Sequence, residues 1–129
     1  MRRVALTLLA LALAGCSDAA GGGGSDRVVV EMLEGQRFDP DIAVVPAGTT
    51  VRFVNESAEA HTVTAYDGVP EYFASGGFGS EEEARDALSD ALIGQEQSYE
   101  FTFDEPGTYR YFCIPHEEQQ MEATIEVEE

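Results

Sequence analysis

Residues 109–121 read Tyr-Arg-Tyr-Phe-Cys-Ile-Pro-His-Glu-Glu-Gln-Gln-Met, an aromatic strand pattern that leads into a short loop. The loop carries Cys113, His116 and Met121, which offer a thiolate, an imidazole and a thioether. Sulfur ligands are soft, and imidazole suits copper as well as zinc, so this set favours a copper ion held for electron transfer. The segment therefore predicts a metal site at the end of a strand, with one nitrogen ligand still to be supplied.

The missing nitrogen has one source, because the chain contains only two histidines. His61 begins the segment His-Thr-Val-Thr-Ala-Tyr, which predicts a strand at residues 61–66 beside the Cys113 loop. Taken singly, each residue has a structural explanation: a lone histidine is usually a surface or satisfied core residue, and a methionine can fill the core. Taken together, the predicted metal ligands are His61, Cys113, His116 and Met121.

Short segments with strand character recur between turn residues along the chain. In residues 99–103, aromatic and polar side chains alternate, which predicts one buried face and one solvated face. Seven short strands at this spacing predict an all-β sandwich or barrel. The predicted strands are residues 28–33, 42–45, 50–54, 61–66, 99–103, 108–112 and 123–127.

One segment has helical character instead. Ser80 is followed by three glutamates in a capping box, and apolar residues then recur at helical spacing until Gly94. The pattern predicts one short inserted helix at residues 81–93, with an apolar stripe that covers the core. Its acidic face is explained most simply by contact with water, and docking of a partner is the alternative.

The charge balance limits the classes of partner. The chain has 129 residues, of which 25 are acidic and 7 basic, and every basic residue is arginine. This excess opposes nucleic-acid binding and favours a well-hydrated surface or basic partners. The same composition favours a salt-loving source organism, and the length fits a single folded domain.

The first 26 residues have the pattern of an export and anchoring segment. Two arginines precede an apolar run too short to span a bilayer, which predicts a removed signal peptide at residues 1–15. Residues 13–16, Leu-Ala-Gly-Cys, resemble a lipoprotein processing site, which implies a lipid on Cys16. Residues 16–26 then form a Gly-rich tether, and residues 27–129 form the domain. The protein is therefore expected to be exported and anchored by lipid to the outer face of the cell membrane.

The spacing of the ligands carries a family resemblance. Two residues separate Cys113 from His116, four separate His116 from Met121, and His61 lies far upstream. This pattern resembles the plastocyanin branch of the blue copper proteins, or cupredoxins, and is most similar to the halocyanins. The similarity runs over residues 27–127 and includes residues 46–53, 61–63, 73–78 and 106–113.

The resemblance implies a Greek-key β-sandwich, cupredoxin-like, with one mononuclear type 1 copper ion that cycles between Cu(II) and Cu(I). His61, Cys113 and His116 would form a trigonal plane around the ion, and Met121 would be a long axial ligand. The implied partners are protein electron donors and acceptors, and the protein is expected to be a monomer.

Two positions depart from the family pattern. The family usually has Gly-Met-x-Gly around the axial methionine, whereas residues 120–123 read Gln-Met-Glu-Ala, so a relaxed loop is expected there. Thr62 stands where plastocyanins have asparagine, and its hydroxyl is a candidate partner of the ligands. The resemblance also implies that His116 lies near the surface in an apolar patch. Candidate contributors to that patch are Pro115, Phe78 and Pro70.

Other interpretations share parts of this pattern. A copper carrier or store would use similar ligands but favours an open site rich in Met or His, and the chain has three Met and two His. A metal-free exported binding module would explain the strands but not the ligands. A disulfide between Cys16 and Cys113 would join a tail to a loop with little structural gain. An enzyme is not expected, because four protein ligands leave no open coordination position.

Overall fold

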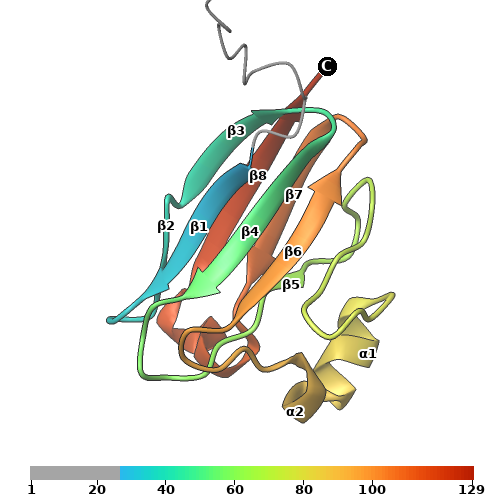
Figure 1. The fold of residues 1–129 in the computed structure, drawn as a ribbon. Coiled ribbons are helices and arrows are strands. Elements are labelled where there is room, and N and C mark those ends of the chain that lie inside the picture. Colours follow the sequence, from blue (N-terminus) through green and yellow to red (C-terminus); the bar gives the residue numbers. More distant parts are fainter. Residues whose placement is uncertain (1–26) are drawn as a thin grey trace, which may run out of the picture.

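The computed structural model describes residues 27–129, whose strands form two four-stranded sheets packed face to face (Figure 1). In spatial order, the first sheet contains β2 (Arg37–Asp39), β1 (Arg27–Leu33), β4 (Thr49–Asn55) and β6 (Ser98–Phe103). The second contains β3 (Ile42–Pro46), β8 (Glu122–Glu128), β7 (Gly107–Phe112) and β5 (Thr64–Ala65). The predicted all-β sandwich is confirmed. The predicted signal peptide, the lipid on Cys16 and the tether lie outside the described residues.

The ligand loop joins two neighbouring strands of the second sheet. β7 pairs with β8 in antiparallel fashion, and the connection between them contains the 3-10 helix η1 (Ile114–Gln119). Each sheet also contains one parallel pair, β1 with β4 and β3 with β8, because the chain passes from one sheet to the other between these strands. The connection through η1 therefore lies at one end of the sandwich, where loops from both sheets meet (Figure 1).

Aromatic side chains fill the space between the sheets. The ring centroid of Phe73 lies 5.0 Å from that of Phe103, 5.9 Å from that of Tyr111 and 6.3 Å from that of Phe53. Each such ring pair adds about 0.5–1.5 kcal/mol beyond the burial of its area. The predicted alternation in residues 99–103 is confirmed, because their three aromatic side chains all pack into or against the core. This core holds the long connection between β4 and β6 against the second sheet.

The segment at residues 61–66 is less regular than predicted. Within it, only the two residues of β5 form a strand. The backbone N–H of Thr62, which could have joined a strand ladder, donates instead to Cys113 Sγ at 3.3 Å. Since each backbone N–H has one proton to donate, a contact made to the sulfur is lost to the sheet.

The prediction of one continuous helix at residues 81–93 is wrong. The structure has two short helices, α1 (Glu81–Asp86) and α2 (Leu88–Ala91), separated by a break. The helical pattern cannot continue through Ile93, because Ile93 exchanges two backbone hydrogen bonds with His61, of 2.7 and 3.1 Å. Pairing beside the site therefore overrides the local helical preference. At four to six residues, none of the helices within residues 27–129 could span a bilayer.

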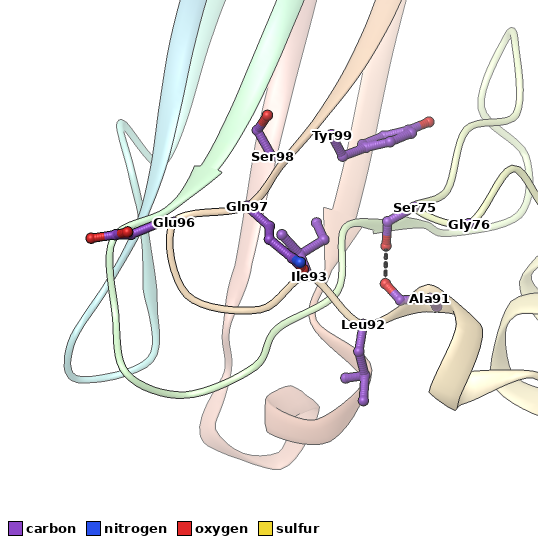
Figure 2. A pocket seen from close by; sticks show the side chains of 9 residues that line it. All are labelled: Ser75, Gly76, Ala91, Leu92, Ile93, Glu96, Gln97, Ser98 and Tyr99. Carbon is purple, nitrogen blue, oxygen red and sulfur yellow. Dashed lines mark hydrogen bonds between the residues drawn. The ribbon is translucent and has the colours of Figure 1, made fainter.

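A surface pocket of about 450 Å³ lies between α2 and the start of β6 (Figure 2). On one side, Ser75 Oγ donates a hydrogen bond of 2.6 Å to the Ala91 carbonyl. Ile93 also lines the pocket, and its backbone pairs with His61. The pocket is therefore linked to the histidine segment through main chain, although neither histidine is among its lining residues.

Candidate metal centre

The structure brings the side chains of His61, Cys113 and His116 together at one end of the sandwich. Nδ1 of His61 lies 3.1 Å from Nδ1 of His116, and Cys113 Sγ lies 3.6 and 3.3 Å from these two nitrogens. His61 and Cys113 are fully buried, and His116 is partly buried. Two imidazole nitrogens and one sulfur at these distances form a donor set suited to a copper ion.

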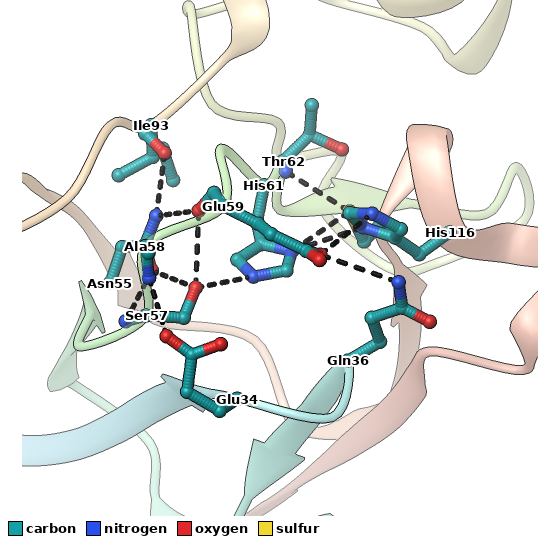
Figure 3. A network of polar contacts seen from close by, with 11 residues as sticks. Glu34, Gln36, Asn55, Ser57, Ala58, Glu59, His61, Thr62, Ile93 and His116 are labelled. Carbon is teal, nitrogen blue, oxygen red and sulfur yellow. Dashed lines mark hydrogen bonds and ion pairs between the residues drawn. The ribbon is translucent and has the colours of Figure 1, made fainter.

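The ring of His61 is oriented by the loop that follows β4 (Figure 3). Ser57 Oγ lies 2.7 Å from His61 Nε2. The hydroxyl also reaches two acceptors, the side-chain oxygen of Asn55 at 2.8 Å and the carbonyl of Glu59 at 3.1 Å. Because a hydroxyl has one proton, and these oxygens can only accept it, Ser57 accepts from the Nε2–H of His61. The lone pair on His61 Nδ1 is thereby directed into the site.

The ring of His116 is oriented by the same loop. Glu59 Oε2 lies 3.1 Å from His116 Nε2 and also accepts from the side-chain amide of Gln36 at 3.3 Å. A carboxylate oxygen accepts hydrogen bonds, so the Nε2–H of His116 donates to Glu59, and Nδ1 is the ring nitrogen that faces the site. Both imidazoles therefore present Nδ1 to the site and bond Nε2 outside it, as metal-binding histidines generally do. The residues present thus fit a bound metal ion.

Burial shapes the protonation of the ligands. Burial lowers the pKa of His61, and the neighbouring His116 lowers it further, so the imidazole is neutral and able to ligate. Burial raises the pKa of the Cys113 thiol, which the N–H of Thr62 partly offsets. A bound metal ion therefore has to displace the thiol proton, since the thiolate is the ligand.

Met121 ends the ligand loop and is fully buried. The Cys113 N–H donates to the Met121 carbonyl at 3.0 Å, and the Met121 N–H donates to the His116 carbonyl at 3.2 Å. Before it, Gln120 has a left-handed backbone (φ 61°, ψ 36°), the conformation in which glycine is favoured. The expected relaxation is therefore not observed at Gln120, which keeps a backbone angle suited to the absent glycine.

The comparison with known families agrees with this geometry. Residues 27–128 match the copper binding proteins of the plastocyanin/azurin family. This chain belongs to the plastocyanin/azurin family. The cofactor of the family is copper, and His61, Cys113, His116 and Met121 together form an arrangement like a type 1 copper site.

Relatives of this plastocyanin/azurin protein include both plastocyanins and amicyanins. Plastocyanin from Scenedesmus fuscus is 36% identical over 92 residues, which cover 70% of this chain and 86% of that protein. Amicyanin from Paracoccus denitrificans is 30% identical over 102 residues, which cover 79% of this chain and 68% of that protein. The predicted family is confirmed, whereas a closer similarity to halocyanins stays a prediction.

Solved structures support the same assignment of this plastocyanin/azurin protein. A reduced amicyanin mutant has a TM-score of 0.61 and 29% identity, covering 82% of this chain and 84% of that one. A copper-containing nitrite reductase from Thermus scotoductus has a TM-score of 0.63 and 30% identity, covering 80% of this chain but 22% of that one. The chain therefore matches nearly all of a small copper protein and only a part of a larger enzyme.

Two residues that contact the histidines, Ser57 and Glu59, are not predicted by the sequence of this chain. Ser57 and Glu59 belong to no motif, and their only signal is a polar loop directly before His61. Thr62 was predicted as a partner of the ligands. Its N–H does bind the Cys113 sulfur, and its hydroxyl accepts from the Ile114 N–H at 2.9 Å, which ties two ligand segments together.

The surroundings of His116 differ from the expected apolar patch. Pro115 is exposed beside it, but the Nε2 edge of the ring meets the carboxylate of Glu59. Pro70 packs against Gly107, at the start of β7, while the ligand loop follows the other end of that strand. Pro70 is therefore not part of the surface around His116, and its prediction as a contributor is wrong.

Proposed function

We propose that this protein is a blue copper electron-transfer protein whose single copper ion is bound by His61, Cys113 and His116, with Met121 as the axial ligand. The observation that carries the proposal is the convergence of two Nδ1 atoms and one Sγ, each imidazole being bonded at Nε2 outside the site. A copper carrier is less well supported, because an exchangeable site needs access and three of the four ligand side chains, His61, Cys113 and Met121, have no exposed surface.

Copper supplies a one-electron couple between Cu(II) and Cu(I), and the protein supplies a fixed set of ligands. Main-chain hydrogen bonds tie the loop at both Cys113 and Met121, and Thr62 joins it to the His61 segment. Ligands that do not move between oxidation states lower the reorganisation that accompanies the electron. A reduced protein donor would lose one electron to the site, and an oxidised protein acceptor would take it away.

The test is to load the metal-free mature protein with Cu(II) and record the bound copper and the visible spectrum. One equivalent of copper and an intense blue band are expected. Cys113→Ser should remove the blue band and leave the sandwich folded, because Cys113 is one small member of a core that is built mainly by the strands of both sheets. Cys16→Ser is the matched control and should keep the colour. A blue protein without Cys113 would contradict the ligand assignment.

The proposal includes export and attachment to the outer face of the cell membrane through a lipid on Cys16. It is supported by the pattern of residues 13–16 and by the Gly-rich segment that follows. A tether of about ten residues would give the domain a mean reach of roughly 15–20 Å. Wild-type protein should partition with membranes in its native host, and Cys16→Ser should not. A wild-type protein that is fully soluble and unlipidated there would refute this part.

The proposed partners are protein electron donors and acceptors with basic docking surfaces. The chain carries a formal net charge of −18, which would steer basic partners toward it. Rates of electron exchange with a candidate partner should fall as salt rises at low ionic strength. In molar salt the screening length is about 3 Å, so steering should become small there. If the rate of electron exchange does not change with salt, steering of basic partners is wrong, and the acidic surface serves only hydration.

A further inference from the structure

The Nε2 edge of His116 is covered by a carboxylate from another segment of the chain (Figure 3). The ring of His116 is only partly exposed, with 14% of its side-chain surface accessible, and Glu59 Oε2 lies 3.1 Å from Nε2. The amide of Gln36, from the turn between β1 and β2, donates to the same carboxylate oxygen at 3.3 Å. The carboxylate of Glu59 is therefore held by two residues, Gln36 and His116, and His116 is one of the proposed metal ligands.

The side chain of Glu59 contributes separately from its backbone. The Glu59 carbonyl accepts hydrogen bonds from Asn55 Nδ2 at 2.7 Å and from Ser57 Oγ at 3.1 Å, and these bonds fix the loop. The carboxylate makes no contact with the loop's own backbone among the hydrogen bonds of residues 27–129. Replacing the side chain of Glu59 should therefore leave the loop in place, together with the hydrogen bond between Ser57 and His61.

We propose that Glu59 is a positioning residue of the copper centre, which fixes the His116 ring with Nδ1 toward the metal and lowers the reduction potential. This proposal rests on the proposed function. Accepting the Nε2–H makes the ring a more basic ligand, which favours Cu(II). A fixed negative charge close to the site also stabilises Cu(II) more than Cu(I), since the higher charge interacts more strongly. Both effects act in the same direction.

The two histidines donate to acceptors of different charge. Ser57 is a neutral acceptor for His61, while Glu59 is a charged acceptor for His116, and both come from the loop after β4. The two histidines thus receive the same orientation, but only His116 receives a negative charge. Removing the charge at Glu59 while keeping an acceptor should therefore change the potential without changing the tautomer.

The first measurement is the reduction potential of three copper-loaded proteins: wild type, Glu59→Gln and Glu118→Gln. Glu118 lies on η1, is exposed and is the matched control, because its replacement removes the same charge close to His116 without a contact to a ligand. We expect Glu59→Gln to raise the ratio of Cu(I) affinity to Cu(II) affinity on the order of tenfold. For a one-electron couple this corresponds to a rise in the reduction potential of about 59 mV. Equal shifts in the two variants would overturn the role of Glu59 in setting the potential.

The second measurement uses metal-free protein and the nitrogen NMR signals of the imidazoles. Both rings should carry the proton on Nε2 in the wild type and in Glu59→Gln, whose amide oxygen can still accept. In Glu59→Ala, His116 should become a mixture of tautomers, while His61, bonded to Ser57, should not change. An unchanged His116 would overturn the positioning role. Because this readout needs no metal, it decides the role of Glu59 even if the protein proves not to bind copper.

Discussion

Cys113 is fixed through its main chain and its side chain at once. Its N–H donates to the Met121 carbonyl, its carbonyl accepts from the His116 N–H at 3.2 Å, and its sulfur receives the Thr62 N–H. All three contacts are made within the chain itself, so they restrict the freedom of Cys113 that ligation would otherwise have to remove. A substitution at the sulfur should consequently change the chemistry of the site more than the shape of the loop.

Met121 can be tested as a ligand against its role in packing. Met121→Leu should keep the blue colour and raise the reduction potential, because a weak axial donor to Cu(II) is lost. If Met121 only packed, this nearly volume-conserving change would destabilise the fold by under about 1.5 kcal/mol and leave the potential unchanged. Voltammetry separates the two. Met32→Leu is the control, since Met32 is equally buried but lies on β1.

Gln120 is strained in the left-handed region, and its replacement should relieve that strain. Gln120→Gly is expected to stabilise the fold by about 1 kcal/mol, because a left-handed residue with a Cβ is disfavoured by about that amount. Chemical denaturation of the metal-free variants measures the difference. Gln119→Gly should do the opposite, since Gln119 lies within η1 and glycine is unfavourable there. Equal destabilisation by both changes would mean that Gln120 carries no strain.

At the scale of elements, α1 is attached to the ligand helix η1 by one arginine. Arg85 donates to both carboxylate oxygens of Glu117, at 2.8 and 3.1 Å, and to Glu81 within α1 at 3.0 Å. Its guanidinium also lies 4.6 Å from the centre of the Phe112 ring. The pair with Arg85 lowers the pKa of Glu117. The inserted segment is thus linked to the residue that follows His116.

Cutting this link should weaken the fold modestly and in a salt-dependent way. Arg85→Gln is expected to lower the free energy of unfolding by about 1 kcal/mol, because a bidentate but partly exposed ion pair and a ring contact are lost. The difference from wild type should shrink as salt rises. Arg27→Gln is the control, because its pair with Glu100 is longer, at 3.7 Å, and more exposed. A loss equal to that of the control would show that Arg85 does not join the two elements.

The elements that sequence predicts well are those whose pattern is local. The alternation in residues 99–103 and the ligands of residues 113–121 lie within short stretches, so spacing alone carries them. The end of the helical segment after α2 could not be predicted, because it is imposed by pairing of Ile93 with His61, more than thirty positions away. Glu59 was missed for the same reason, since its contact with His116 exists only after two loops meet at the end of the sandwich.

At the scale of the whole molecule, the types of ionisable residue in the chain decide which groups change charge at alkaline pH. The chain has 25 acidic residues and no lysine, so between neutral pH and about pH 10 few groups other than the thiol and the chain's amino terminus change charge. The five tyrosines come next, and they pack among rings or against strands of the sandwich. The alkaline limit of the fold should therefore be set by the tyrosines.

Burial is the main cause of a raised tyrosine pKa throughout the sandwich. It raises the pKa of Tyr99 to about 12 and also raises the pKa of Tyr66, Tyr72 and Tyr109. In the unfolded chain these groups ionise near pH 10. Above that pH the unfolded chain binds fewer protons than the folded chain, so the slope of stability against pH is negative. The stability that the neutral tyrosines provide is complete below about pH 10 and is lost as pH rises toward their folded pKa values.

Denaturant unfolding of metal-free Cys113→Ser protein from about pH 8 to about pH 11 tests this expectation, since that background removes the titration of the thiol. The free energy of unfolding should be nearly constant up to about pH 10 and then fall with a slope that steepens. Adding Tyr99→Phe should make the fall shallower, because one group that ionises only on unfolding is gone. A free energy of unfolding that stays constant up to about pH 11 would show that the tyrosines do not limit stability in this range. The same slope with and without Tyr99 would show that another group causes the fall.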